Sequence, residues 1–316
     1  KLLMYSRYLT TRAFSTSAGK NKVGFIGMGN MGIFMARNLT KNGFAVQGYD
    51  LSDKQMQAAE AHGIKACGSM GEAAKNVDYI VSALPMTHHV ENMLHHESDG
   101  VFANASEHTH ICDASTISPL ASQKFAEQAK KHNMVFLDTP MSGGVGGAEA
   151  GTLTFMVGGE KHELEHVRPM LEGMGKNIFH CGGAGTGEIA KLSNNLILGI
   201  NMIAASEGMA LGEKLGIDPK ILQQILSVST ARGHCIDTYN PRPGLLENVP
   251  ASRNYENGFG VSLIKKDLGL ALEVAESCNA STKFTELSRE IYDTLEKQGL
   301  GTKDFGIVFQ HVLKNE

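Results

Sequence analysis

Residues 182–216 read GGAGTGEIAKLSNNLILGINMIAASEGMALGEKLG, and this stretch separates two halves of different character. Glycine occupies four of its first six positions, proline is absent, and Gly216 stands where a glycine commonly ends a helix. The pattern predicts one long helix. Its middle, 196–205, is apolar on nearly every side, which predicts a buried helix. This apolar run is too short to span a membrane.

A lysine and an amide side chain lie near the start of the predicted helix. Lys191 and Asn195 are four residues apart, so a helix would place them one turn apart on the same face. Two such polar groups at the entrance to an apolar helix indicate a binding or catalytic site. A solvated first turn is the alternative, and this stretch alone does not separate the two.

The composition is that of a globular protein of 316 residues, which is long enough for two domains. Apolar residues make up 42% of the chain and charged residues 20%, so a sizeable core is expected. The net charge of -4 gives no basic footprint for nucleic acid. The five cysteines are widely spaced without a C-x-x-C pair, which favours reduced thiols and argues against a zinc site. We expect no metal.

Residues 1–20 do not resemble part of a folded domain. They contain basic and hydroxyl side chains but no acid, and the first acidic residue of the chain is Asp50. This composition is typical of a mitochondrial transit peptide, and RAFS at 12–15 resembles a matrix-protease site with cleavage after Phe14. We therefore expect a location in the mitochondrial matrix. A disordered tail or cloning residue is the alternative.

Residues 22–32, KVGFIGMGNMG, combine a short apolar strand, 22–26, with the motif G-x-G-x-x-G and the start of a helix. In this context the glycines permit a tight turn, close approach to a diphosphate, and packing of the helix on the strand. The helix N-terminus favours the negative charge of the diphosphate. The predicted cofactor-binding residues here are Gly27, Met28, Gly29, Asn30, Met31 and Gly32.

Asp50 ends the second predicted strand, 45–49, at the spacing expected for an acid that binds the adenosine ribose. A carboxylate there accepts hydrogen bonds from the ribose hydroxyls and repels a 2′-phosphate. The sequence therefore predicts NAD rather than NADP as the cofactor. Lys54 is close enough in sequence to weaken this preference slightly.

Further strands, 77–84, 110–113 and 135–138, alternate with helices and predict a parallel α/β sheet. Ligands bind at the carboxyl ends of such strands. This makes Leu84, Pro85 and Thr116 candidate cofactor contacts. Histidines crowd the same region, at 88, 89, 95, 96, 108 and 110. They lack acidic partners at ligand spacing, so we interpret them as solvated residues rather than a metal site.

A second glycine-rich stretch, 139–147, reads TPMSGGVGG and precedes LTFMVGG at 153–159. Backbone N–H groups freed from side-chain bulk form a nest for an anion such as a carboxylate. A flexible linker is the alternative, but the flanking residues are typical of strands.

Five segments resemble the β-hydroxyacid dehydrogenase family in order and spacing. They are GFIGMGNMG (24–32), DASTISP (113–119), DTPMSGGVGGAEAGTLTFMVGG (138–159), GTGEIAKLSNN (185–195) and LIKKDLGLA (263–271). The loop 239–255, YNPRPGLLENVPASRNY, resembles the 3-hydroxyisobutyrate dehydrogenase branch. The resemblance implies a Rossmann-type NAD-binding α/β domain at 22–184, an all-α domain at 185–316 built around one long central helix, and an active site between them.

The resemblance also implies roles for individual residues. Lys191 matches the catalytic lysine of the family. Matching substrate-binding residues are Ser142, Gly143, Gly144 and Asn195, and matching residues near the cofactor are Leu84, Pro85, Thr116 and Lys266. Met86, Thr87 and His89 depart from the family pattern, so no role is carried over to them. From sequence alone, the charged run 265–267 is typical of a solvated helix face.

The implied reaction is NAD-dependent oxidation of 3-hydroxyisobutyrate to methylmalonate semialdehyde, a step of valine degradation, with Lys191 as general acid/base. Burial between domains and proximity to Lys266 would lower the pKa of this lysine. One alternative is a related enzyme acting on glyoxylate or succinic semialdehyde; another is a catalytically silent cofactor-binding protein. The expected partners are a small 3-hydroxy acid and further copies of the chain, as a dimer or tetramer, without nucleic acid or membrane.

Overall fold

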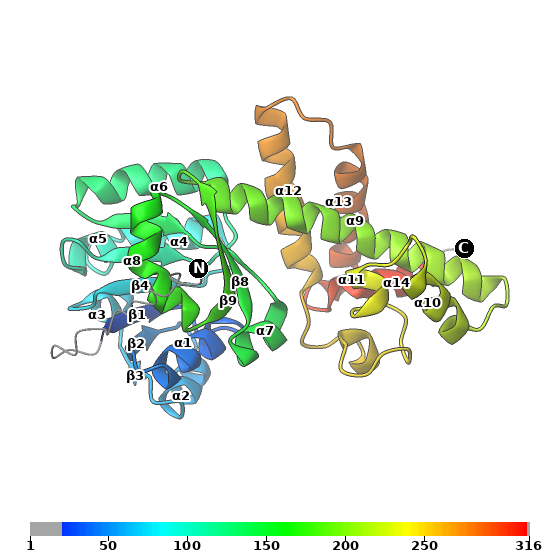
Figure 1. Ribbon diagram of the computed structural model, residues 1–316, viewed down its shortest axis with the longest axis horizontal. Coiled ribbons are helices and arrows are strands. Elements are labelled where there is room, and N and C mark those ends of the chain that lie inside the picture. Colours follow the sequence, from blue (N-terminus) through cyan, green and yellow to red (C-terminus); the bar gives the residue numbers. More distant parts are fainter. Residues whose placement is uncertain (1–20, 315–316) are drawn as a thin grey trace, which may run out of the picture.

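The computed structural model describes residues 21–314, which form an α/β lobe and a helical lobe joined by helix α9 (Thr186–Lys214) (Figure 1). The predicted fold class is confirmed: a Rossmann-type α/β domain is followed by a helical domain with a helix of 29 residues. The leader predicted at 1–20 lies outside the described residues.

A mostly parallel sheet forms the centre of the α/β lobe. Its order is β3-β2-β1-β4-β5-β6-β8-β7, and β9 pairs with β8. The strands are β1 (Lys22–Ile26), β2 (Ala45–Tyr49), β3 (Lys65–Ala66), β4 (Tyr79–Ser82), β5 (His110–Asp113), β6 (Val135–Asp138), β7 (Met141–Ser142), β8 (Leu153–Gly158) and β9 (Gly175–Gly182). Strands β1 to β6 run parallel, whereas β8 is antiparallel to β6 and β7. The strand order reverses beside β1, and ligands bind at such a point.

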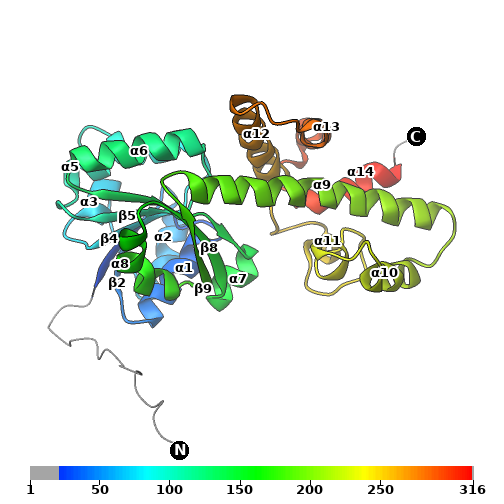
Figure 2. The same cartoon turned by 45° about the horizontal axis from the view of Figure 1, so that its top comes forward.

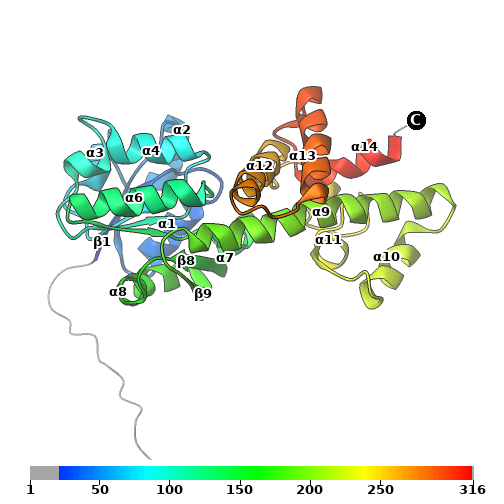
Figure 3. The same ribbon diagram turned by 90° about the horizontal axis from the view of Figure 1, so that it is seen from above.

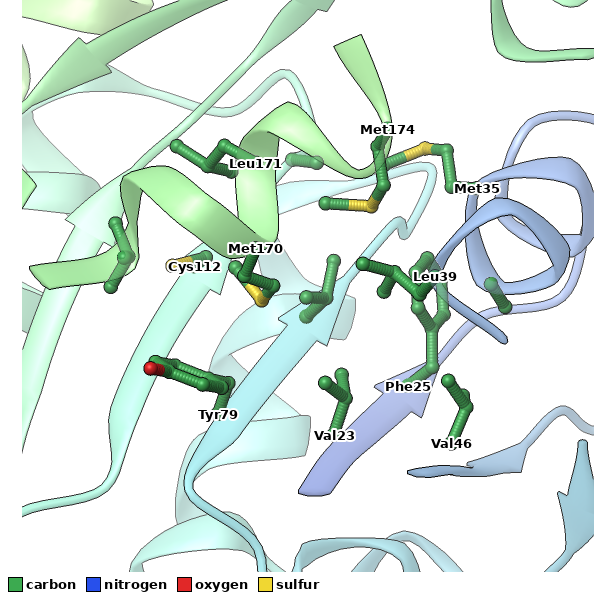
Figure 4. Close-up of a cluster of buried hydrophobic side chains, with 14 of the residues drawn as sticks. Val23, Phe25, Met35, Leu39, Val46, Tyr79, Cys112, Met170, Leu171 and Met174 are labelled. Carbon is green, nitrogen blue, oxygen red and sulfur yellow. The ribbon is translucent and has the colours of Figure 1, made fainter. Parts of the chain in front are cut away.

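Helices cover both faces of the sheet, which explains why β4 and β5 are buried at every position. One face is covered by α1 (Gly32–Lys41), α2 (Asp53–Glu60), α7 (Gly144–Ala150) and α8 (Lys161–Glu172). The other is covered by α3 (Met70–Ala74), α4 (Thr87–His95), α5 (Val101–Asn104) and α6 (Pro119–Lys131). Figure 4 shows the first layer, in which Met170 of α8 and Leu39 of α1 lie over Phe25 and Tyr79.

The helical lobe is built around α9. Figure 2 shows α12 and α13 on one side of this helix and α10 and α11 on the other, and Figure 3 shows α9 running the length of the lobe. The helices packed against it are α10 (Pro219–Val228), α11 (His234–Asp237), α12 (Val261–Ser277), α13 (Lys283–Leu295) and α14 (Val308–Lys314). Tyr292 of α13 is fully buried, and its hydroxyl donates to the carbonyl of Gly199 at 3.2 Å. This bond ties α13 to the middle of α9.

Helix α9 is not buried on every side, and in this respect the prediction was wrong. Met202 is fully buried, but Ile197 is 58% exposed and Leu211 62% exposed. Contrary to the expectation from its apolar run, the helix is also long and apolar enough to cross a membrane by length and composition, with a mean hydropathy of 1.2 over its best 18-residue window. The core helix of a soluble protein meets the same test, and the five helices packed around α9 favour that interpretation.

Candidate active site

The glycine motif forms a tight turn at the carboxyl end of β1. Gly27 has φ +97°, and its N–H donates to the carbonyl of Tyr49 at 2.9 Å. A Cβ at Gly32 would lie 1.9 Å from the Gly27 carbonyl oxygen, so only glycine lets α1 approach the turn. A Cβ at Gly29 would meet nothing within 4 Å, which leaves that part of the turn open to a ligand. These residues fit the diphosphate of a dinucleotide.

Asp50 joins this turn to the end of β2. Its Oδ2 accepts the N–H of Met28 at 2.7 Å, and its Oδ1 accepts the N–H of Ser52 at 2.8 Å. Both bonds fix the carboxylate in place, and each oxygen keeps a second lone pair for a ribose hydroxyl. Lys54 is exposed, and no ion pair joins it to Asp50 in the described part of the chain.

A hydrogen-bonded network places the ends of β4 and β5 side by side. Asp113 is fully buried and accepts the hydroxyls of Ser82 at 2.7 Å and Ser115 at 2.6 Å. The Ser115 hydroxyl in turn accepts the N–H of Leu84 at 2.8 Å. Burial raises the pKa of Asp113 to about 6. The predicted contacts Leu84 and Thr116 therefore lie on two neighbouring loops that share one anchor.

Helix α12 reaches the second of these loops from the helical lobe. Lys266 Nζ donates to the carbonyl of Thr116 at 2.6 Å and lies 2.9 Å from Asp267 Oδ1. Asp267 Oδ2 accepts the side-chain amide of Asn195 at 2.5 Å. Only 15% of the Lys266 side chain and 3% of the Asp267 side chain are exposed. The interpretation of 265–267 as a solvated face is therefore wrong for these two residues.

Lys191 lies one turn before Asn195 and interacts electrostatically with the same group of charges. Burial lowers the pKa of Lys191, and nearby Lys266 lowers it further, while Asp267 and Glu188 act in the opposite direction. Among residues 21–314 its ammonium donates no hydrogen bond. A partly buried lysine beside a second lysine, with its nitrogen uncommitted, has the properties of a proton acceptor.

The glycine-rich stretch after β6 is ordered, so the alternative of a flexible linker is wrong. Ser142 ends β7 and pairs with Thr154 of β8, and α7 begins directly after Gly143. Gly143 and Gly144 have positive φ angles of +137° and +61° and are exposed. No interaction joins these residues to Lys191 in the described residues. Their predicted contact with the substrate carboxylate stays a prediction.

One of the histidines expected to be solvated, His110, is instead buried. Its Nε2 lies 2.7 Å from Glu163 Oε2, and its ring stacks on that of His166 at 4.3 Å. His88 and His89 contact each other at the start of α4, where both are exposed. No cluster suited to a metal ion occurs in residues 21–314.

Comparison with known proteins decides the family. Residues 22–183 match the model described as the NAD binding domain of 6-phosphogluconate dehydrogenase. Residues 185–312 match the model described as NAD-binding of NADP-dependent 3-hydroxyisobutyrate dehydrogenase. The probable mitochondrial 3-hydroxyisobutyrate dehydrogenase of Dictyostelium discoideum is 46% identical over 308 residues, which cover 98% of this chain and 95% of the relative. The chain belongs to the 3-hydroxyisobutyrate dehydrogenase family.

Other members of the 3-hydroxyisobutyrate dehydrogenase family are nearly as similar. The mitochondrial human enzyme of that name is 40% identical, covering 95% of this chain and 89% of its own. An NAD-dependent L-serine dehydrogenase of Pseudomonas aeruginosa is 42% identical, with 91% and 96% covered. The structure of Mycobacterium tuberculosis 3-hydroxyisobutyrate dehydrogenase with L-serine has a TM-score of 0.85 at 35% identity, covering 94% of this chain and 100% of that one. The chain is thus an NAD(P)-dependent β-hydroxyacid dehydrogenase, and a catalytically silent role is not favoured.

Two buried acids near Lys191 were not found from the sequence. Glu188 is fully buried and Asp267 is 2% exposed. The sequence signal that could have found them was their position: Glu188 lies one turn before Lys191, and Asp267 directly follows Lys266. Spacing along a helix places such residues near one another, but it does not show which of them is covered by the other domain.

Proposed function

We propose that the chain catalyses NAD-dependent oxidation of the primary alcohol of 3-hydroxyisobutyrate to methylmalonate semialdehyde, a step of valine degradation. The supporting observation is that Lys191 and Asn195 of α9 interact with Lys266 and Asp267 of α12, and that Lys266 in turn reaches the loop that carries Thr116, at the junction of the two lobes. Several relatives with 40–46% identity carry the name 3-hydroxyisobutyrate dehydrogenase, which supports this substrate.

Lys191 is the proposed general base. Its lowered pKa increases the fraction of neutral amine near pH 7, so Nζ can take the hydroxyl proton as the alcohol is oxidised. Bound NAD⁺ supplies the hydride acceptor. Ser142, Gly143, Gly144 and Asn195 hold the substrate carboxylate in this proposal. Such proton transfer typically contributes a factor of about 10² to 10⁴ in rate.

We propose NAD as the cofactor. The supporting observation is the fixed carboxylate of Asp50 beside the glycine turn, where a 2′-phosphate would meet its charge. The residues proposed to hold the diphosphate are Gly27, Met28, Gly29, Asn30, Met31 and Gly32. Those proposed to line the nicotinamide side are Leu84, Pro85, Thr116 and Lys266.

L-Serine is a second candidate substrate, because the Pseudomonas relative is named an L-serine dehydrogenase and the Mycobacterium structure is described with L-serine. L-Serine and 3-hydroxyisobutyrate share a carboxylate and a primary alcohol at the same spacing. A panel of both acids, each with NAD⁺ and NADP⁺, separates the candidates, with glyoxylate and succinic semialdehyde tested in the reducing direction. We expect the highest kcat/KM for 3-hydroxyisobutyrate with NAD⁺; a higher value for L-serine would replace the proposed substrate.

A location in the mitochondrial matrix and a homo-oligomeric state complete the proposal. The Dictyostelium and human relatives are named as mitochondrial, which supports the location. Helix α10 has no buried residue, and its Val228 is 85% exposed. On α13, Phe284 is 75% exposed. A second copy of the chain would cover such apolar side chains in a dimer or tetramer. Light scattering of the purified protein tests this.

A further inference from the structure

Glu188 lies in the first turn of α9, one turn before Lys191, and its side chain is fully buried. Its Oε2 accepts the N–H of Ile117 at 3.2 Å. Its Oε1 has no hydrogen-bond partner among the described residues. Burying a carboxyl group with one unbonded oxygen costs free energy of folding, and the cost is larger for the charged form.

The bond from Ile117 to Glu188 crosses the junction between the α/β lobe and α9. Ile117 directly follows Thr116, whose carbonyl accepts Lys266 Nζ at 2.6 Å. The loop is therefore held from two helices, by Glu188 of α9 and by Lys266 of α12. On the other side, Asp138 accepts the backbone N–H of Glu188 at 3.1 Å and fixes the start of α9 on the sheet.

We infer that Glu188 is a positioning residue, which holds Thr116 at the nicotinamide side of the site in register with Lys191 one turn further along α9. This inference rests on the proposed roles of Thr116 and Lys191. Its physical basis is that hydride and proton transfer require the reacting atoms to be held closely, and a misplacement of about 1 Å can cost about 10²-fold in rate.

Burial disfavours the charged form of Glu188. Burial raises the pKa of Glu188 well above its usual value, and Asp113 and Asp138 raise it further, while the Ile117 N–H and Lys266 act against them more weakly. The groups facing it are thus Asp113 of β5, Asp138 of β6, Lys266 of α12 and, on its own helix, Lys191.

Four variants test the inference. Glu188→Gln keeps the side-chain length and one oxygen acceptor. Glu188→Asp shortens the side chain by one methylene, and Glu188→Ala removes the acceptor. Glu207→Ala is the matched control, since Glu207 lies on the same helix and is exposed. We measure kcat, KM and the pH profile of kcat with the hydroxy acid that the parent uses best, and the melting temperature of each variant.

We expect kcat to fall by about tenfold or more in Glu188→Ala and Glu188→Asp, with substrate KM within about threefold of the parent. Glu188→Gln should restore kcat relative to Glu188→Ala. A purely structural role would lower the melting temperature of Glu188→Ala without lowering kcat per folded molecule.

Either of two results would overturn the inference: a parent-like kcat in Glu188→Ala, or a Glu188→Gln variant as slow as Glu188→Ala. The second would show that the charge of Glu188, not its acceptor, matters. If Glu188→Ala does not fold, the comparison of Glu188→Gln with Glu188→Asp decides. If the parent prefers L-serine, the proposed substrate is wrong, but the expected ranking of the variants by kcat stays the same.

Discussion

Asn195 of α9 donates its side-chain amide to Asp267 of α12 at 2.5 Å, and the same carboxylate lies 2.9 Å from Lys266 Nζ. One buried acid thus orients two residues that were predicted to contact substrate and cofactor. Asp267 also acts on a third residue, Lys191, because its negative charge raises the pKa of that lysine.

The first prediction concerns this carboxylate. Asp267→Asn removes the charge that most strongly favours protonated Lys191, so the pKa of Lys191 should fall further. Oxidation needs the neutral amine and is lost as pH falls through this pKa. The acid limb of kcat should therefore move to lower pH. Asp293→Asn on the surface of α13 is the control, and an equal shift in both variants would contradict the prediction.

Lys191→Met tests the general base. Methionine keeps the length and apolar stem of the lysine but cannot carry the proton, so kcat should fall by about 10² or more while folding and NAD⁺ affinity stay nearly unchanged. The parent profile should show an ionisation below about 10.4, the ordinary value for lysine, and the variant should lack it. Cofactor fluorescence titration and steady-state rates measure both parts. Lys214→Met, at the exposed far end of α9, is the control. Turnover within threefold of the parent would make Lys266 the residue to test.

Asp50→Asn tests the cofactor preference. The parent should favour NAD⁺ over NADP⁺ by about 10² in kcat/KM, because a 2′-phosphate would lie against a fixed carboxylate. Asparagine removes the charge and keeps an oxygen that can accept the Met28 N–H, so the gap should narrow without loss of the turn. Asp50→Ser should narrow it as well. Equal use of both cofactors by the parent would show that another group, with Lys54 nearest in sequence, overrides Asp50.

The pH dependence of stability tests the buried network of β4 and β5. The pKa of Asp113 is raised to about 6 in the folded chain, from 3.8. The stabilising effect of this group is thus present below pH 4 and lost as pH rises through about 6. Asp113→Asn cannot ionise, so its melting temperature relative to the parent should be higher at pH 7.5 than at pH 4. An unchanged difference would show that the pKa of Asp113 is the same in the folded and the unfolded chain.

The leader prediction is tested on protein isolated from its natural source. If residues 1–14 are a transit peptide, the mature chain begins at Ser15 in the mitochondrial matrix. N-terminal sequencing of organelle fractions measures this. Retention of residues 1–14 in a cytosolic pool would contradict it.

The fold followed from sequence wherever an apolar run was bounded by glycine or turn residues. Strands β1, β2, β5 and β6 begin and end at the predicted residues. Strand β9 was not predicted, because Lys176, His180 and other polar side chains face solvent along it. Helix α7 was missed because glycine disfavours helices; it is supported by Asn38, whose amide donates to the Ala148 carbonyl at 2.7 Å.

The candidate site was predictable where its members share one helix or one motif. The spacing of Lys191 and Asn195 indicated a common face. The acid that accepts the Asn195 amide comes from α12, far along the chain, and only the folded structure shows that Asp267 is buried there. The exposed face of α9 could not be predicted for the same reason: hydrophobicity does not reveal what covers a side chain.

The attachment of α9 has a mechanical consequence. Asp138 holds the first turn of the helix on the sheet by accepting the N–H of Gly185 at 2.7 Å, while the body of the helix belongs to the other lobe. If the lobes rotate about that fixed end, a tilt of about 5° displaces the far end of this rod by about 4 Å, at about 1.5 Å of rise per residue. Lys191, about 8 Å from the pivot, moves by less than about 1 Å. Such a rotation would therefore move the far end of the helical lobe while the proposed base stays nearly in place relative to the sheet.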